Sequence, residues 1–347
     1  MAPAATQGID DLALRIRAGD RRALSRGISW IEDQTPMGRA LLDRLYDATP
    51  RCHRVGITGP PGSGKSTLTS ELTRSLRGRE EVVGILAVDP SSPFTGGAIL
   101  GDRIRMQAHH GDPGVFIRSM ASRGSLGGLA STTYEASEAL EAAGCTWILI
   151  ETVGVGQSEM EIIEAADTTI VVLVPESGDA VQVMKAGLME AADLFVINKF
   201  DREGGDRLEK EIHLLLELER DRRLEEATGS GEPWEPRICR TVAIRGEGID
   251  DLHALIEAHR NWMRADPVLW AARRRKRTAR RLRTLLRDHL LHGLWQSGEL
   301  DAWVEESERR VDAGEASPYA LVDAMVSRLL SGGNGPRPGS AGRGSER

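Results

Sequence analysis

A phosphate-binding pattern, G-x-x-x-x-G-K-[ST], is complete at Gly59-Pro60-Pro61-Gly62-Ser63-Gly64-Lys65-Ser66. Glycines let the backbone N–H groups of such a loop turn inward around phosphate groups, and the start of the following helix adds positive potential. Lys65 can neutralise the β- and γ-phosphate oxygens, and the Ser66 hydroxyl is a ligand for Mg²⁺. The sequence therefore predicts that the loop from Gly59 to Thr67 binds a nucleoside triphosphate, with Lys65 also serving its hydrolysis.

A second pattern, N-K-x-D, stands directly after an apolar run as Asn198-Lys199-Phe200-Asp201. An aspartate carboxylate can accept hydrogen bonds from both N1–H and the exocyclic amine of guanine, whereas adenine has no donor at N1. Further along, the backbone amides of Thr241-Val242-Ala243 are placed to contact the guanine O6. These residues, with Asn198, Lys199 and Asp201 foremost, predict GTP or GDP as the bound nucleotide.

Acidic residues follow two other apolar runs. Glu151-Thr152-Val153-Gly154 takes the place of the D-x-x-G pattern, in which the acid lies near Mg²⁺ and the amide of the glycine, here Gly154, faces the γ-phosphate. Asp89 closes the run VVGILAV, and Asp102 lies in the loop that follows. Since Mg²⁺ takes oxygen ligands and usually keeps several waters, we expect it to be held by Ser66, Asp89, Asp102 and Glu151. Glu151 is also a candidate catalytic residue.

Short apolar runs alternate with helical patterns from Arg54 onward. Six runs are near-continuously apolar, as expected for strands that helices cover on both faces. They are Val55–Ile57, Val82–Val88, Trp147–Ile150, Thr169–Val174, Leu194–Ile197 and Ile238–Val242. The pattern predicts an α/β fold with a doubly wound, mostly parallel sheet of the P-loop type.

Helical periodicity extends on both sides of this region. Residues 9–47 predict helices with breaks near Gly19 and Pro36, and residues 248–330 predict helices with breaks near Pro267 and Pro318. We therefore expect four parts. They are an N-terminal helical extension (1–50), a nucleotide-binding domain (51–262), a C-terminal helical arm (263–330) and a disordered tail rich in Gly, Pro, Ser and Arg (331–347).

Composition narrows the class of protein. The net charge of −7 argues against general nucleic-acid binding, and the basic run from Arg273 to Arg287 carries leucines at helical spacing, which favours an amphipathic helix. No window approaches the ~20 apolar residues of a membrane helix. The three scattered cysteines form no metal-type spacing or disulfide framework, and the N-terminus lacks a signal pattern. We expect a cytoplasmic protein that binds neither membranes nor nucleic acid.

Several runs together resemble the MeaB/ArgK family of P-loop GTPases, to which the human methylmalonic aciduria type A protein is related. These runs are GPPGSGKST, VDPSSPFTGGAILGDRIRM, ETVGVGQSE, PESGDAVQVMKAG and NKFD. The resemblance covers roughly residues 10–330. It implies a GTP-hydrolysing, homodimeric chaperone of an adenosylcobalamin-dependent acyl-CoA mutase, which gates cofactor loading and protects the mutase. The segment from Pro175 to Lys185 corresponds to the third switch of the family, with Asp179 and Lys185 as charged members that respond to the partner.

Other functions remain open at this stage. The partner is methylmalonyl-CoA mutase in typical members, but an isobutyryl-CoA or other mutase would fit equally. An older interpretation of the family is a kinase or ATPase linked to the transport of basic amino acids, which would need an adenine site. A metallochaperone GTPase that inserts nickel or cobalt would carry Cys/His ligands. A nucleic-acid protein would use the run from Arg273 to Arg287.

Overall fold

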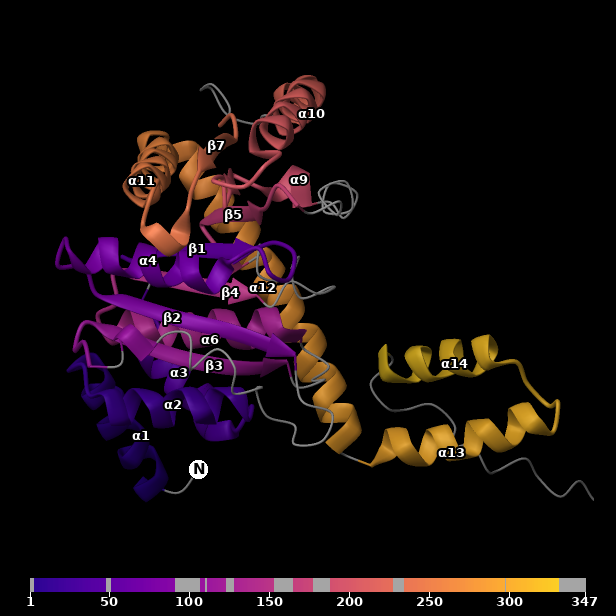
Figure 1. Cartoon of the computed structure of the whole chain (residues 1–347). Helices are drawn as coiled ribbons and strands as arrows, with labels where there is room; N and C mark the ends of the chain where they lie inside the picture. Colours follow the sequence, from indigo (N-terminus) through magenta and orange to yellow (C-terminus); the bar gives the residue numbers. More distant parts are fainter. Residues whose placement is uncertain are drawn as a thin grey trace, which may run out of the picture. The chain divides into compact units, whose positions relative to one another are not determined.

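A sheet of seven parallel strands organises the nucleotide-binding part of the chain (Figure 1). The computed structural model describes residues 3–47, 51–90, 107–109, 111–122, 128–152, 165–176, 188–226, 234–296 and 298–330. The strands are β1 (His53–Thr58), β2 (Val83–Pro90), β3 (Val115–Ser122), β4 (Trp147–Thr152), β5 (Thr168–Leu173), β6 (Leu194–Ile197) and β7 (Arg237–Arg240). The prediction of a doubly wound parallel sheet is confirmed.

The strand order β3-β2-β4-β1-β5-β6-β7 puts β1 in the middle. After β1 the chain builds one half of the sheet, through β2, β3 and β4, and then crosses to the other side of β1 to add β5, β6 and β7. Ligands of open α/β sheets bind at the carboxyl ends of the strands, where this reversal occurs. The loops after β1, β4 and β6 therefore meet at one edge.

Helices cover both faces of the sheet. One face packs against α4 (Lys65–Arg77) and α11 (Ile249–Ala265), through a core that includes Ile57, Leu72 and Ile256. The other face is covered in two parts. Over β2, β3 and β4 lie α6 (Gly128–Ala142) and the N-terminal helices, and over β5 and β6 lie α9 (Leu188–Ala191) and α10 (Gly205–Glu226).

The three N-terminal helices are α1 (Pro3–Arg17), α2 (Arg21–Glu32) and α3 (Pro36–Leu45). Their breaks fall where the sequence predicts them. Asp20 caps α2 by accepting hydrogen bonds from the amides of Arg22 and Ala23, and Thr35 caps α3, whose first residue is a proline. The helices share one hydrophobic core with α6, so they belong to the same compact unit as the sheet.

Strand β3 was missed by the sequence prediction. It is an edge strand with β2 as its partner, and it alternates apolar residues with polar ones such as Arg118 and Ser119. Arg118 makes an ion pair with Glu32 and contacts Ser29 on α2. A search for continuous apolar runs finds central strands, whereas an edge strand with polar positions lacks that signal.

The C-terminal part is helical, as predicted. It contains α12 (Pro267–Gln296), α13 (Glu299–Asp312) and α14 (Pro318–Leu330), with an additional break at Gly298, whose φ of +68° is left-handed. The chain divides into compact units of residues 1–285 and 286–347, and the four-part division expected from sequence stays a prediction. None of the described helices is long and apolar enough to cross a membrane.

Candidate nucleotide-binding site

The phosphate loop joins β1 to α4 at the carboxyl edge of the sheet. Two of its glycines are required by close contacts and by left-handed backbone angles. A Cβ on Gly59 (φ +138°) would lie 2.2 Å from the carbonyl oxygen of Val172 on β5, and a Cβ on Gly64 (φ +89°) would lie 2.3 Å from Nδ2 of Asn198. The loop therefore sits directly against the two neighbouring strand ends. Helix α4 begins at Lys65, as predicted.

Lys65 lies in the mouth of this loop. Its Nζ donates hydrogen bonds to the carbonyl oxygens of Gly59 (2.7 Å) and Pro60 (3.0 Å), and the residue is only 5% exposed. The sequence alone suggested a solvated charge at this position, and that expectation is wrong. The amine is held where an incoming phosphate would compete with the two carbonyls for it.

Ser66 and Glu151 are brought together, as the predicted metal set requires. The Ser66 hydroxyl donates a short hydrogen bond to Oε1 of Glu151, and both residues are buried. Beside them, the Thr152 hydroxyl lies 3.3 Å from that of Thr58 at the end of β1. The carboxylate at the end of β4 thus faces the first turn of α4.

Other members of the predicted metal and phosphate set are less fully described. Asp89 belongs to β2 and is paired in register with Ala121, but its side chain is not among the described ones. Asp102 and Gly154 lie outside the described residues. Asp179 and Lys185 of the expected third switch also lie outside them.

Asn198 connects the phosphate loop to the expected base-binding loop. Its Nδ2 donates to the carbonyl oxygen of Ser63 (2.8 Å). Its Oδ1 accepts from the Thr241 hydroxyl and from the Ala243 amide, each at 3.1 Å. The side chain is 2% exposed, so all three contacts are shielded from water. The structure thereby joins three segments that are far apart in the sequence.

The neighbours of Asn198 extend this arrangement. Lys199 has a left-handed φ of +56° and donates from Nζ to the Gly62 carbonyl oxygen at 2.8 Å. Asp201 accepts from Nη2 of Arg245 at 3.1 Å. Arg245 ends the short 3-10 helix η2 (Ala243–Arg245), directly after the predicted Thr241-Val242-Ala243. The sequence contained no signal for this ion pair.

His109 is a second contact that sequence reasoning missed. A solvated helix end was expected around His109 and His110, yet His109 is 6% exposed. Its Nε2 lies 3.0 Å from both Oγ and the carbonyl oxygen of Ser70, one turn after Ser66 on α4. His109 belongs to the short 3-10 helix η1 (Gln107–His109), which this contact fixes to the phosphate-loop helix.

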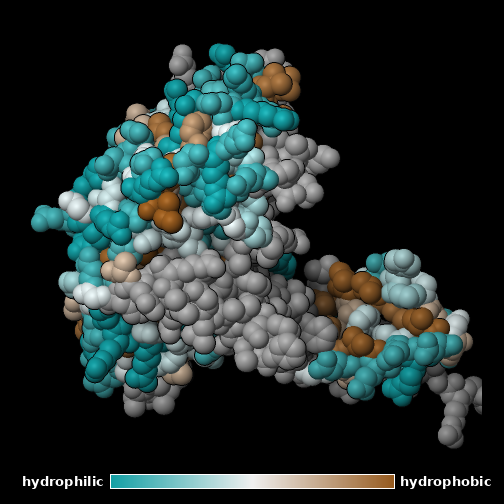
Figure 2. All heavy atoms as spheres, viewed as in Figure 1, coloured by the Kyte–Doolittle hydropathy of each residue, from teal (hydrophilic) through white to brown (hydrophobic). Residues whose placement is uncertain are grey.

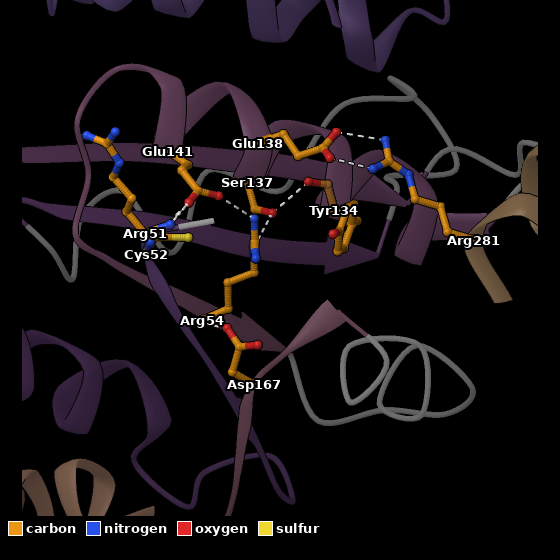
Figure 3. A network of polar contacts seen from close by, with 9 residues as sticks. All are labelled: Arg51, Cys52, Arg54, Tyr134, Ser137, Glu138, Glu141, Asp167 and Arg281. Atoms are coloured by element: carbon orange, nitrogen blue, oxygen red, sulfur yellow. Dashed lines mark hydrogen bonds and ion pairs between the residues drawn. The ribbon is translucent and has the colours of Figure 1, made fainter. Parts of the chain in front are cut away.

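Beneath the site, a buried polar network holds β1 against α6 (Figure 3). The Arg54 guanidinium donates to Glu141 (2.8 Å) and Ser137 (2.9 Å), and its backbone amide donates to Asp167 (2.9 Å). Arg281 of α12 pairs with Glu138 on the same face of α6. The guanidinium carbons of Arg54 and Arg281 lie 5.1 and 4.5 Å from the centre of the Tyr134 ring. Strand β1, which leads into the phosphate loop, is thus anchored at its start.

A second polar row lies at the amino edge of the sheet. His53 Nε2 and His259 Nδ1 both lie 2.8 Å from the Thr168 hydroxyl, and His259 Nε2 lies 3.3 Å from Asp193. The carboxylate favours a proton on Nε2 of His259. Nδ1 then accepts from Thr168, whose oxygen is left to accept from His53. Burial lowers the pKa of His53 to about 3, so this imidazole is neutral.

A central parallel strand that runs through a glycine-rich turn into a helix, with a lysine at the mouth of the turn, defines the P-loop nucleoside triphosphatases. This chain has that architecture and the Asn-Lys-x-Asp turn beside it. The family model described as "Methylmalonyl Co-A mutase-associated GTPase MeaB" matches residues 24–299, and the chain belongs to this family of GTPases.

Similar proteins agree with this membership. The chain is 45% identical over 325 residues to a Pyrococcus abyssi protein provisionally named a GTPase, covering 94% of this chain and 98% of that one. It is 32% identical over 340 residues to the mouse methylmalonic aciduria type A homolog, named as mitochondrial, covering 93% and 80%. A crystal structure titled "LAO/AO transport system kinase" superposes with a TM-score of 0.66 at 25% identity, covering 95% and 99%. The resemblance seen in the sequence is confirmed.

Proposed function

We propose that this GTPase is a chaperone of an adenosylcobalamin-dependent acyl-CoA mutase, most simply methylmalonyl-CoA mutase. In this proposal GTP binding and hydrolysis gate the loading of the cofactor and protect the mutase. The description of the family and the name of the mouse relative support the choice of partner. The cytoplasm is the proposed location.

The choice of guanine rests on the position of Asn198. This residue bonds to Ser63 in the phosphate loop and to Thr241 and Ala243 in the other loop, so the N-K-x-D turn is fixed beside the phosphates. Asp201 then reads the N1–H and amine donors of guanine. GTP and GDP should bind much more tightly than ATP in a titration. In the Asp201→Asn variant, preference should move toward xanthine nucleotides, whose C2 carbonyl needs a donor.

The residues present fit a Mg²⁺ ion. The Ser66 hydroxyl and the Glu151 carboxylate are adjacent hard oxygen donors at the mouth of the phosphate loop. Among the described residues, no three His, Cys, Asp or Glu side chains gather to hold a metal ion. Mg²⁺ suits such a place, because it is usually held by one or two carboxylates together with substrate phosphates and water. Ser66 and Glu151, with Asp89 and Asp102, would hold it, and the ion would neutralise phosphate charge.

We also propose that the third switch carries the response to the mutase. Asp179 and Lys185 would move toward the nucleotide or the opposing subunit when the partner binds, and there stabilise charge in the phosphoryl-transfer transition state. The Lys185→Ala variant should keep basal hydrolysis and GTP affinity but lose most of the acceleration by the mutase. Full acceleration in this variant, with the complex verified in the same samples, would contradict the role.

The decisive experiment for the proposed function uses purified full-length protein and a panel of cobalamin-dependent acyl-CoA mutases. Calorimetry with GDP and with a non-hydrolysable GTP analogue should give a complex whose affinity depends on the nucleotide. GTP hydrolysis should also accelerate with the cognate mutase. If no mutase associates under either nucleotide, the chaperone proposal fails while the GTPase assignment stands.

Two other functions give different results in the same assays. The crystal structure titled "LAO/AO transport system kinase" keeps a kinase or ATPase in view, which should bind ATP at least as well as GTP. A metal-inserting GTPase should bind nickel or cobalt without nucleotide. The three cysteines offer no such site, because all are buried and burial raises the pKa of Cys145 and of Cys239 to about 12.

A further inference from the structure

Arg245 makes an ion pair with the aspartate that is proposed to read the base. Its Nη2 lies 3.1 Å from Oδ2 of Asp201, and the side chains are 57% and 34% exposed. Arg245 lies outside the P-loop and N-K-x-D patterns. It stands at the end of η2, two residues after Ala243 in the loop that Asn198 binds.

The backbone around Arg245 is fixed at several points. Its amide donates to the Val242 carbonyl oxygen at 2.8 Å, and the Val242 amide donates to the Glu247 carbonyl oxygen at 3.1 Å, which closes a tight turn. At the base of the turn, the Phe200 amide donates to the Thr241 carbonyl oxygen at 3.1 Å. The guanidinium therefore approaches Asp201 from a closed turn that is bonded to the aspartate's own segment.

An exposed aspartate needs such a contact to present a fixed edge. The terminal torsion of a carboxylate is broad and loosely held, whereas two donors of one base must meet its oxygens in one plane. Each oxygen accepts more than one hydrogen bond, so Oδ2 can keep its contact with Arg245 while it accepts from a base. The ion pair thus restricts the carboxylate without occupying it.

We infer that Arg245 is a specificity-determining residue: it positions Asp201 for guanine and makes the site depend on the 2-amino group of the base. This inference rests on the proposed guanine site at Asp201. The ligand class it concerns is a purine nucleoside diphosphate or triphosphate. Inosine nucleotides, which keep N1–H and lack the amine, are the matched probes.

The test measures the affinities of GDP, IDP and ADP for wild-type protein and for the Arg245→Met variant. Exposed ion pairs contribute ~0.2–1 kcal/mol, which corresponds to a ~1.5- to 5-fold loss of GDP affinity. IDP affinity should fall less, so the ratio of GDP to IDP affinity decreases. Arg245→Lys, which keeps the charge but not the rigid fork, should retain part of the ratio. Arg207→Met removes another exposed ion pair, on α10, and should change nothing.

A double-mutant cycle separates positioning from a general effect on the loop. In an Asp201→Ala background, Arg245→Met should have no further effect on GDP affinity. Equal losses for GDP and IDP, an unchanged ratio, or tighter GDP binding in Arg245→Met would each overturn the inference, the last by showing that Arg245 competes with the base. Wild-type protein that binds GDP no better than ADP would instead remove the proposed guanine site itself.

Discussion

Lys65 is the residue at which the phosphate loop closes on itself. Its two hydrogen bonds to Gly59 and Pro60 give the amine partners inside the loop. A phosphate group would offer it charged oxygens in their place, and hydrogen bonds between charged groups are roughly twice as strong as neutral ones. The exchange of partners therefore favours the bound state.

We expect the Lys65→Ala variant to lose GTP hydrolysis by about 10²–10³-fold, the usual cost of removing one such electrostatic contact. Stability should change by only ~1 kcal/mol, because the two loop carbonyls can turn to water. Turnover with Mg²⁺ and thermal unfolding measure the two effects, and Lys210→Ala on the exposed face of α10 is the control. Hydrolysis at the wild-type rate would contradict the role of the loop.

At the level of elements, the sequence predicted what depends on local pattern. The central strands, the helix after Gly64 and the breaks at Asp20 and Thr35 all carry apolar runs or capping residues. Contacts between distant segments were not accessible in this way. The pair of Arg245 with Asp201 spans 44 residues, and that of His109 with Ser70 spans 39. No periodicity or motif encodes such distances, because they follow from packing.

The polar row between β1, β5 and α11 predicts a pH dependence of stability. His53 has an ordinary pKa of 6.5 and a folded value of about 3. Below pH 6.5 the unfolded chain binds a proton that the folded chain refuses, so stability is complete above this pH and falls as the pH falls toward 3. Between pH 7 and pH 5 the loss should be about 2 kcal/mol.

Urea unfolding at these two pH values, on wild type and on His53→Gln, checks this prediction. The variant should be less stable at pH 7 but should lose about 2 kcal/mol less on acidification. The comparison isolates His53 from His253, whose pKa is also lowered by burial. Equal losses in the two proteins would show that another group is responsible.

At the scale of the whole molecule, the C-terminal helices expose apolar side chains. Leu282, Leu286 and Leu290 follow one another at four-residue spacing on α12, and they are 61%, 61% and 57% exposed. In the second unit, Figure 2 shows apolar atoms over α13 and α14, where Leu321 and Met325 are buried but Val322 and Val326 are not. Apolar surface of this extent marks an interaction site, and a second copy of the chain is the proposed partner.

Replacing Leu286 and Leu290 together by aspartate should convert the proposed dimer into monomers. Two charges in an apolar interface remain without partners, which favours dissociation by several kcal/mol. Sedimentation equilibrium measures the association, and nucleotide affinity should stay at the wild-type value. Leu214→Asp, on the exposed side of α10, is the matched control. A wild-type chain that sediments as a monomer at all concentrations would contradict the proposal.

The amide of Asn198 has a consequence for how the two halves of a nucleotide communicate. One buried side chain holds the loop for the phosphates with its nitrogen and the loop for the base with its oxygen. A ligand that orders either loop reduces the freedom the other still has to lose, and such linkage is reciprocal. Pyrophosphate and guanosine, added as separate molecules, should therefore each bind more tightly in the presence of the other, by the same factor.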